Sequence, residues 1–107
     1  MSDTTFPAPG HSWAAHFGDL AFRLDFDPDG RKLAFAAIGT EQAAEGNQTV
    51  EYTAVPLRQG LFLVYWQEAG GTTVSHVEDF AEGRVHTNIT SPDGTFFNAS
   101  GAWEQLA

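Results

Sequence analysis

The fold is decided by residues 61–80, which read LFLVYWQEAGGTTVSHVEDF. The first six of these residues are apolar at odd and even positions alike, which is typical of a strand that is covered on both sides or lies centrally in a sheet. Gly70 and Gly71 are a strong hairpin signal, and residues 72–78 follow them as the returning strand. This stretch therefore predicts two antiparallel strands joined by a tight turn.

The rest of the chain repeats this succession of strands and turns. Residues 20–26 alternate apolar side chains on one face with Arg23 and Asp25 on the other, as a half-exposed strand does. Pro56 ends a strand or marks a sheet edge, and Gly101 is a candidate β-bulge. The expected strands are residues 20–26, 32–38, 49–55, 61–66, 72–78, 84–90 and 95–105.

Three segments depart from this pattern. Residues 1–10 predict a loose arm, because they contain two prolines and a glycine. Residues 11–17 predict one or two helical turns, with Ser12 as the N-cap and Gly18 as the stop. Residues 41–47 are the longest polar interruption and predict a loop or a wide turn.

About seven strands joined by tight turns indicate an all-β protein in which sequential strands pair antiparallel. Such a meander exposes two edges unless it closes, and closure into a barrel removes both. We therefore expect a small antiparallel up-and-down β-barrel of seven or eight strands with a short N-terminal helix. Residues 1–107 would form this single domain, with residues 1–18 as the arm and helix.

Composition narrows the classes of function. Five Lys and Arg residues against fourteen Asp and Glu give a formal charge of −9, so nucleic acids and anionic membranes gain no attraction from the whole chain. The absence of cysteine excludes disulfides and thiol chemistry. No export signal, long apolar run, glycine-rich phosphate loop or Gly-x-Ser-x-Gly elbow occurs. We expect a cytoplasmic protein with no nucleic-acid or membrane partner, no metal and no cofactor.

The four histidines are the first candidates for chemistry. His76 and His86 lie on successive expected strands with Glu78 and Asp79 between them, and two histidines with a carboxylate can form a facial triad for a divalent metal. The alternative is that one histidine points outward and the other joins a polar pair across the strands. The sequence leaves both interpretations open, because ligand type without a known register does not define a site.

The loop of the central hairpin decides which side chains share a face. An even-numbered loop places Trp66 and Glu68 on the same face as Ser75, whereas an odd-numbered loop places them beside His76 and Glu78. A change of one residue in loop length exchanges the two sets, so the sequence does not choose between them.

In either register, one face combines large aromatic rings with a few hydrogen-bonding groups, as ligand pockets do. A barrel of about eight strands is just wide enough to be filled by side chains or to hold one small ligand. The alternative is therefore a core in which the same rings only fill space. The candidate ligand-binding residues are Tyr52, Trp66, Glu68, His76, His86 and Trp103.

Residues 63–80, LVYWQEAGGTTVSHVEDF, resemble the MoaF-like domain family, whose name derives from bacterial proteins linked to molybdenum cofactor biosynthesis. The family segment has the form aromatic-W-x-E-x-x-G-x-T-V-x-H-V-x-D, followed by strands that here contain residues 85–90, VHTNIT, and 101–103, GAW. The resemblance implies a small barrel of the calycin and lipocalin kind, a group in which some relatives bind lipophilic molecules or decarboxylate phenolic acids. Longer members resemble two such barrels joined in one chain, whereas this chain has the length of one. The resemblance therefore implies a homodimer, in which a second copy supplies the second barrel.

Three functions follow from these observations. The first is a binding module that holds a small hydrophobic or aromatic molecule in the barrel mouth, with Glu68 and His76 as polar anchors. The second is a non-oxidative enzyme, a decarboxylase or isomerase, in which Glu68 is the general acid or base and His76 orients the substrate. An inward-pointing Arg23 or Arg84 would favour this enzyme, because a substrate carboxylate needs a fixed cation. The third is a filled barrel that acts as a dimerisation or interaction module.

Overall fold

The computed structural model describes residues 5–38 and 48–107, which form nine strands and no helix. No segment within these two ranges is a helix that could cross a bilayer. The expected loop at 41–47 and the first four residues of the expected arm lie outside the described residues. The strands are β1 (Ser12–Phe17), β2 (Leu20–Phe26), β3 (Lys32–Ala37), β4 (Gln48–Glu51), β5 (Thr53–Arg58), β6 (Leu61–Gln67), β7 (Thr73–Asp79), β8 (Arg84–Thr90) and β9 (Phe96–Gln105).

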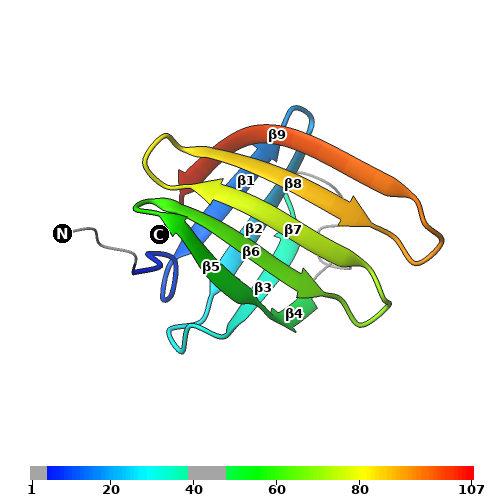
Figure 1. Ribbon diagram of the computed structural model, residues 1–107, viewed down its shortest axis with the longest axis horizontal. Helices are drawn as coiled ribbons and strands as arrows, with labels where there is room; N and C mark the ends of the chain where they lie inside the picture. Colours follow the sequence, from blue (N-terminus) through cyan, green and yellow to red (C-terminus); the bar gives the residue numbers. More distant parts are fainter. Residues whose placement is uncertain (1–4, 39–47) are drawn as a thin grey trace.

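The strands form one antiparallel sheet that wraps into a nearly closed barrel (Figure 1). The order is β4-β3-β2-β1-β9-β8-β7-β6-β5, so every connection except that from β4 to β5 joins paired neighbours, and the first strand pairs with the last. The two ends of the sheet, β4 and β5, are consecutive in the chain and separated only by Tyr52. The predicted all-β up-and-down barrel is therefore confirmed, with its remaining seam between β4 and β5.

The predicted helix and strand number are wrong. Residues 11–17 contain β1 instead of a helix, because Trp13, Ala15 and Phe17 alternate inward and the strand pairs with both β2 and β9. The single strand expected over residues 49–55 is divided at Tyr52 into β4 and β5. These two differences raise the number of strands from the expected seven or eight to nine.

The hairpin between β6 and β7 has the odd-numbered loop. Gln67 pairs with Thr73, and inside this pair Glu68 donates its amide N–H to the carbonyl of Thr72 at 2.7 Å. Gly71 adopts φ 100°, a conformation that other residues rarely accept, so the glycine of this turn is structurally required. The register therefore places the inward side chains of β6 and β7 on one face, with Trp66 beside the strand that carries His76.

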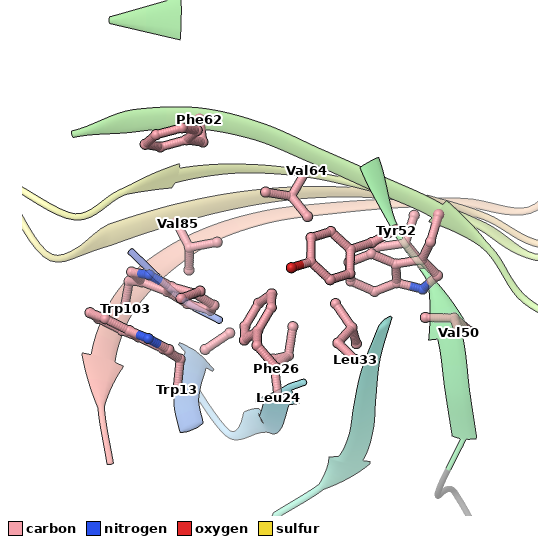
Figure 2. Packing of buried hydrophobic residues seen from close by; sticks show 14 of the residues in the cluster. Trp13, Leu24, Phe26, Leu33, Val50, Tyr52, Phe62, Val64, Val85 and Trp103 are labelled. Carbon is pink, nitrogen blue, oxygen red and sulfur yellow. The ribbon is translucent and has the colours of Figure 1, made fainter. Parts of the chain in front are cut away.

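One end of the barrel is plugged by the segment before β1. The ring of Phe6 packs against four other aromatic rings, with centroid distances between 5.0 Å and 5.8 Å. Phe80 of this cluster also contacts Trp13, and Trp13 stacks on Trp103 with the ring planes 10° apart (Figure 2). The rings around Phe6 are those of Phe26, Tyr52, Phe62 and Phe80. This end of the interior is filled by side chains.

The pairing of β1 with β9, which joins the two halves of the sheet, depends on a glycine. A Cβ atom at Gly101 would lie 1.7 Å from the carbonyl oxygen of His16, which no side chain can tolerate without movement of one strand. The pairing of β8 with β9 runs through Gly101 without a register shift, so the expected bulge is absent there. A register shift instead lies between Pro56 and Arg58 on β5. Pro56 lies within this edge strand, so of the two predictions for it, the sheet edge is confirmed and the strand end is not.

Candidate functional site

A hollow opens at the end of the barrel opposite to Phe6. About 40 Å³ of it is open to water-sized molecules, and about 310 Å³ is free of atoms when its mouth, which is open to solvent, is included. Its walls are almost entirely apolar, with one carboxyl group and one imidazole as the exceptions. The lining residues are Phe22, Leu24, Phe35, Trp66, Glu68, Val74, His76 and Ile89.

Strand alternation brings these side chains together. On β6 and just beyond its end, Trp66 and Glu68 point inward two residues apart. On β7, Val74 pairs directly with Trp66, and His76 lies two residues further into the barrel. The Trp66 ring contacts His76 edge to face, with centroids 5.0 Å apart, and lies 5.9 Å from the ring of Phe35 across the hollow. The hairpin therefore supplies the polar edge of the hollow and its largest ring.

Glu68 is the carboxyl group at the mouth. The indole Nε1–H of Trp66 donates a hydrogen bond to its Oε2 at 3.3 Å. Burial raises the pKa of Glu68 above its ordinary value, and the hydrogen bond from Trp66 counteracts part of that rise. A carboxyl group in this position keeps its proton to a higher pH than an exposed one, and it can then donate as well as accept a hydrogen bond.

Deeper in the barrel, His76 and Glu78 form a buried pair on β7. The distance from His76 Nδ1 to Glu78 Oε2 is 3.1 Å, and the side chain of Glu78 is 0% exposed. Burial raises the pKa of Glu78, and the hydrogen bond and the charge of His76 counteract part of the rise. The second oxygen, Oε1, has no hydrogen-bond partner among the described residues. His76 thus faces the hollow on one side and a buried carboxyl group on the other.

Further polar atoms lie in the interior. Tyr52 directs its hydroxyl group toward the centre of the barrel (Figure 2), where neither it nor Thr87 Oγ1 has a hydrogen-bond partner within the described residues. Burial, followed by the negative charges of Asp29, Glu78 and Asp27, raises the pKa of Tyr52 to about 12. The tyrosine is therefore a neutral hydroxyl group at every ordinary pH.

The structure brings together three of the six predicted ligand-binding residues. Trp66, Glu68 and His76 all line the hollow. Tyr52 and Trp103 also point inward, but they belong to the packed part of the interior and not to the walls of the hollow. His86 lies on the outer wall, where its two ring nitrogens contact Ser100 Oγ at 2.7 Å and Asn88 Oδ1 at 3.1 Å.

The same geometry argues against the facial-triad interpretation. His76 and Glu78 point into the barrel, whereas His86 and Asp79 point outward on the same two strands, so these groups do not face one another. No group of three His, Cys, Asp or Glu side chains within residues 5–38 and 48–107 is arranged to hold a metal ion.

Sequence reasoning missed much of the hollow. Phe22 and Phe35 come from β2 and β3, far along the chain from the central hairpin, and Ile89 comes from β8, where it pairs with Val74. Their alternation was visible, but which strands face each other across the barrel depends on closure. The sequence identified Glu78 only as a candidate metal ligand or as a residue on the same face as Trp66. In the structure, its carboxyl group contacts Nδ1 of His76.

The arginines that would favour a decarboxylase are on the outside. Arg23 bonds to Asp25 through Nε at 2.9 Å on the outer wall, with about half of its side chain exposed. Arg84 is exposed at the start of β8. Within the described residues, no lysine or arginine lines the hollow.

Comparison with known proteins agrees with this architecture. A crystal structure of a protein from Burkholderia vietnamiensis described as a "putative beta-lactamase" superposes with a TM-score of 0.87 and 29% sequence identity, covering 94% of this chain and 97% of that one. A search among curated proteins finds no match. The family model described as MoaF-like matches residues 9–104, which is nearly the whole chain. The chain belongs to the MoaF-like family.

Proposed function

We propose that this barrel binds a small, largely apolar molecule of about one ring in the hollow at its open end. The observation that carries the proposal is the lining of the hollow. Six of its side chains are apolar, and the two polar ones, Glu68 and His76, lie together on one side. Apolar walls with a few converging polar groups are typical of small-molecule sites. The volume of the hollow lies at or below the low end of the range for such sites, so the ligand is small.

Two features favour binding over a filled barrel that acts only through its surface. The interior is packed around Phe6 but retains free space at the other end, where the rings of Phe35 and Trp66 flank the hollow. Buried ionisable groups are also costly in a purely structural core, and Glu78 is fully buried beneath this hollow. A binding role accounts for both features.

The alternative functions lack their chemical groups. A decarboxylase would need a cation near the substrate carboxylate, and Arg23 and Arg84 both lie outside. A serine β-lactamase of the Ser-x-x-Lys kind would need a serine three residues before a lysine, and Asp29 stands at that place before Lys32, the single lysine of the chain. We therefore propose a binding module without assigned catalysis.

The three tryptophans allow a direct test. Their indole N–H groups give separate ¹H–¹⁵N resonances, which Trp66→Phe and Trp103→Phe assign by loss of one signal each. We expect titration with toluene to shift the Trp66 resonance and leave those of Trp13 and Trp103 nearly unchanged, because only Trp66 lines the hollow. The two buried tryptophans near the plugged end are the internal control.

Two results would contradict the proposal. If toluene, phenol and benzoate each left all three resonances unmoved at millimolar concentration, the hollow would accept no such ring. Equal shifts of all three would indicate a global change instead of local binding.

A further inference from the structure

We propose that the ligand is an uncharged molecule with a hydroxyl group, and that this hydroxyl donates a hydrogen bond to Nε2 of His76 while Glu78 positions the imidazole. This inference rests on the proposed function and adds the chemical class of the ligand. It assigns a separate role to the buried pair on β7, which apolar binding alone does not require.

The first step is the orientation of His76. Its ring lines the hollow and is held on one side by the contact of Nδ1 with Glu78 Oε2 at 3.1 Å. Nε2 has no hydrogen-bond partner among residues 5–38 and 48–107. Nε2 is not among the fully buried unpartnered atoms of the described residues, so it is reached from the hollow, and a ligand group that donates to it would take the place of water.

The second step is the tautomer. At a pH above its raised pKa, Glu78 is a carboxylate that only accepts hydrogen bonds, and it then holds the proton of a neutral imidazole on Nδ1. The separation of 3.1 Å fits an N–H donor and a carboxylate acceptor. Nε2 is then left with a lone pair and selects a ligand that donates. Glu78 lies beneath His76 on the side of the plugged end, so it acts on the ligand only through the ring.

The third step is the charge of the ligand. Glu68 stands at the mouth of the hollow and Glu78 lies beneath it, while no lysine or arginine lines its walls within the described residues. The whole chain carries a formal charge of −9. A carboxylate or phosphate in the hollow would lose its hydration and find no cation on the walls to pair with, so the hollow disfavours anions.

Four single-ring probes separate these steps. Phenol and toluene have nearly the same shape and differ in the hydroxyl group, anisole keeps the oxygen without the donor, and benzoate carries the negative charge. We expect phenol to bind about tenfold more tightly than toluene and anisole, since one hydrogen bond to a buried partner is worth about that factor. Benzoate should bind most weakly of the four.

Two variants and one control assign the selectivity to the pair. His76→Phe removes the acceptor but keeps a ring, so toluene should still bind and the phenol preference should fall to about one. Glu78→Gln keeps the shape of the positioning residue but lets an amide N–H face Nδ1, which frees the tautomer and reduces the preference. His86→Phe makes the first change on the outer wall and should alter nothing.

A long-range ¹H–¹⁵N spectrum of the free protein reads the tautomer of His76 directly and does not depend on ligand binding or on the folding of any variant. We expect Nδ1 to carry the proton in the wild type and the population of that tautomer to fall in Glu78→Gln. A proton found on Nε2 in the wild type, equal affinities for phenol and toluene, or preferred binding of benzoate would overturn the inference. Binding of none of the four probes would instead overturn the proposed function.

Discussion

The two ends of the barrel have opposite characters although the same strands build both. At one end, Phe6 closes the interior by packing against rings from β2, β6 and the segments after β4 and β7. At the other end, the apolar side chains stop short of meeting, and the space between them is bordered by Glu68 and His76. Under the proposed function, stability and binding are assigned to different ends of one small fold.

This difference shows how a chain of 107 residues can have both a core and a pocket. A small domain has little buried area to spare, so an unfilled hollow must be offset by dense packing elsewhere. The aromatic cluster around Phe6 and the stacked pair Trp13 and Trp103 supply that packing. We expect substitutions at the two ends to separate stability from ligand affinity.

The largest effect is expected at the plugged end. Phe62→Ala removes a ring that is 1% exposed and packs 5.0 Å from Phe6, so the free energy of unfolding should fall by about 3–5 kcal/mol. Phe35→Ala at the open end removes a half-buried ring and should cost about 1 kcal/mol. Urea unfolding of both variants measures the difference, and equal losses would mean that the two ends are packed alike.

The next effect concerns the pairing of β1 with β9, on which both ends depend. Gly101→Ala places a methyl group against the carbonyl of His16, and the separation of β1 from β9 should lower the free energy of unfolding by about 1–3 kcal/mol. Gly70→Ala is the matched control, because a Cβ atom there meets nothing within 4 Å. Thermal unfolding compares the two, and a Gly101→Ala protein as stable as the control would contradict the close approach.

A smaller effect is expected on binding alone. Ile89→Phe extends a ring into the hollow and should weaken toluene binding about tenfold, or by about 1.4 kcal/mol, with little change in stability. Leu57→Phe makes a similar change on an exposed edge residue and serves as the control. Isothermal titration measures both affinities. Unchanged binding in Ile89→Phe would move the ligand away from the open end.

The smallest effect is on pH dependence. The pKa of Glu78 is raised in the fold above the ordinary value of 4.5, so the folded state holds this proton to a higher pH than the unfolded state does. Its contribution to stability is therefore present below about pH 4.5 and is lost as the pH rises through the folded pKa. In Glu78→Gln, the free energy of unfolding should therefore fall less steeply with rising pH. The difference in slope is at most the ~1.4 kcal/mol per pH unit that one proton carries.

Glu68→Gln, at the rim, is the comparison for this measurement. Its pKa is raised as well, but Glu68 is less deeply buried than Glu78 and should contribute less to the slope. Urea midpoints measured between pH 4 and pH 8 test the sign. A Glu78→Gln protein that loses stability with rising pH as steeply as the wild type would show that Glu78 carries no shifted proton.

Much of the fold could be predicted because its strands alternate cleanly. The bounds of β2 and β8 agree with the expected residues 20–26 and 84–90, since apolar side chains recur at every second position there, with the buried Thr87 as the exception in β8. The helix expected before Gly18 was wrong because Ala14 and Ala15 suit helices locally, while pairing with two strands decides the conformation. Local preference is weaker than closure of the sheet.

The candidate site was predictable only where one hairpin supplies it. Trp66, Glu68 and His76 share two neighbouring strands, and only the parity of the loop remained open. Phe35 reaches the same hollow from β3, which faces the hairpin only after β1 has paired with β9, whereas Ile89 pairs directly with Val74 from the neighbouring strand β8. The outward direction of His86 depends in addition on the register of β7 with β8, in which His86 pairs with Val77.

The most direct test of a binding end is to locate a bound ring. Crystals soaked with bromobenzene would show the bromine by its anomalous scattering, independently of any variant. The account predicts one ordered bromine in the hollow between Phe35, Trp66 and Ile89, with the cluster around Phe6 unchanged. A bromine lodged among the rings around Phe6, or none anywhere in the barrel at saturating bromobenzene, would contradict it.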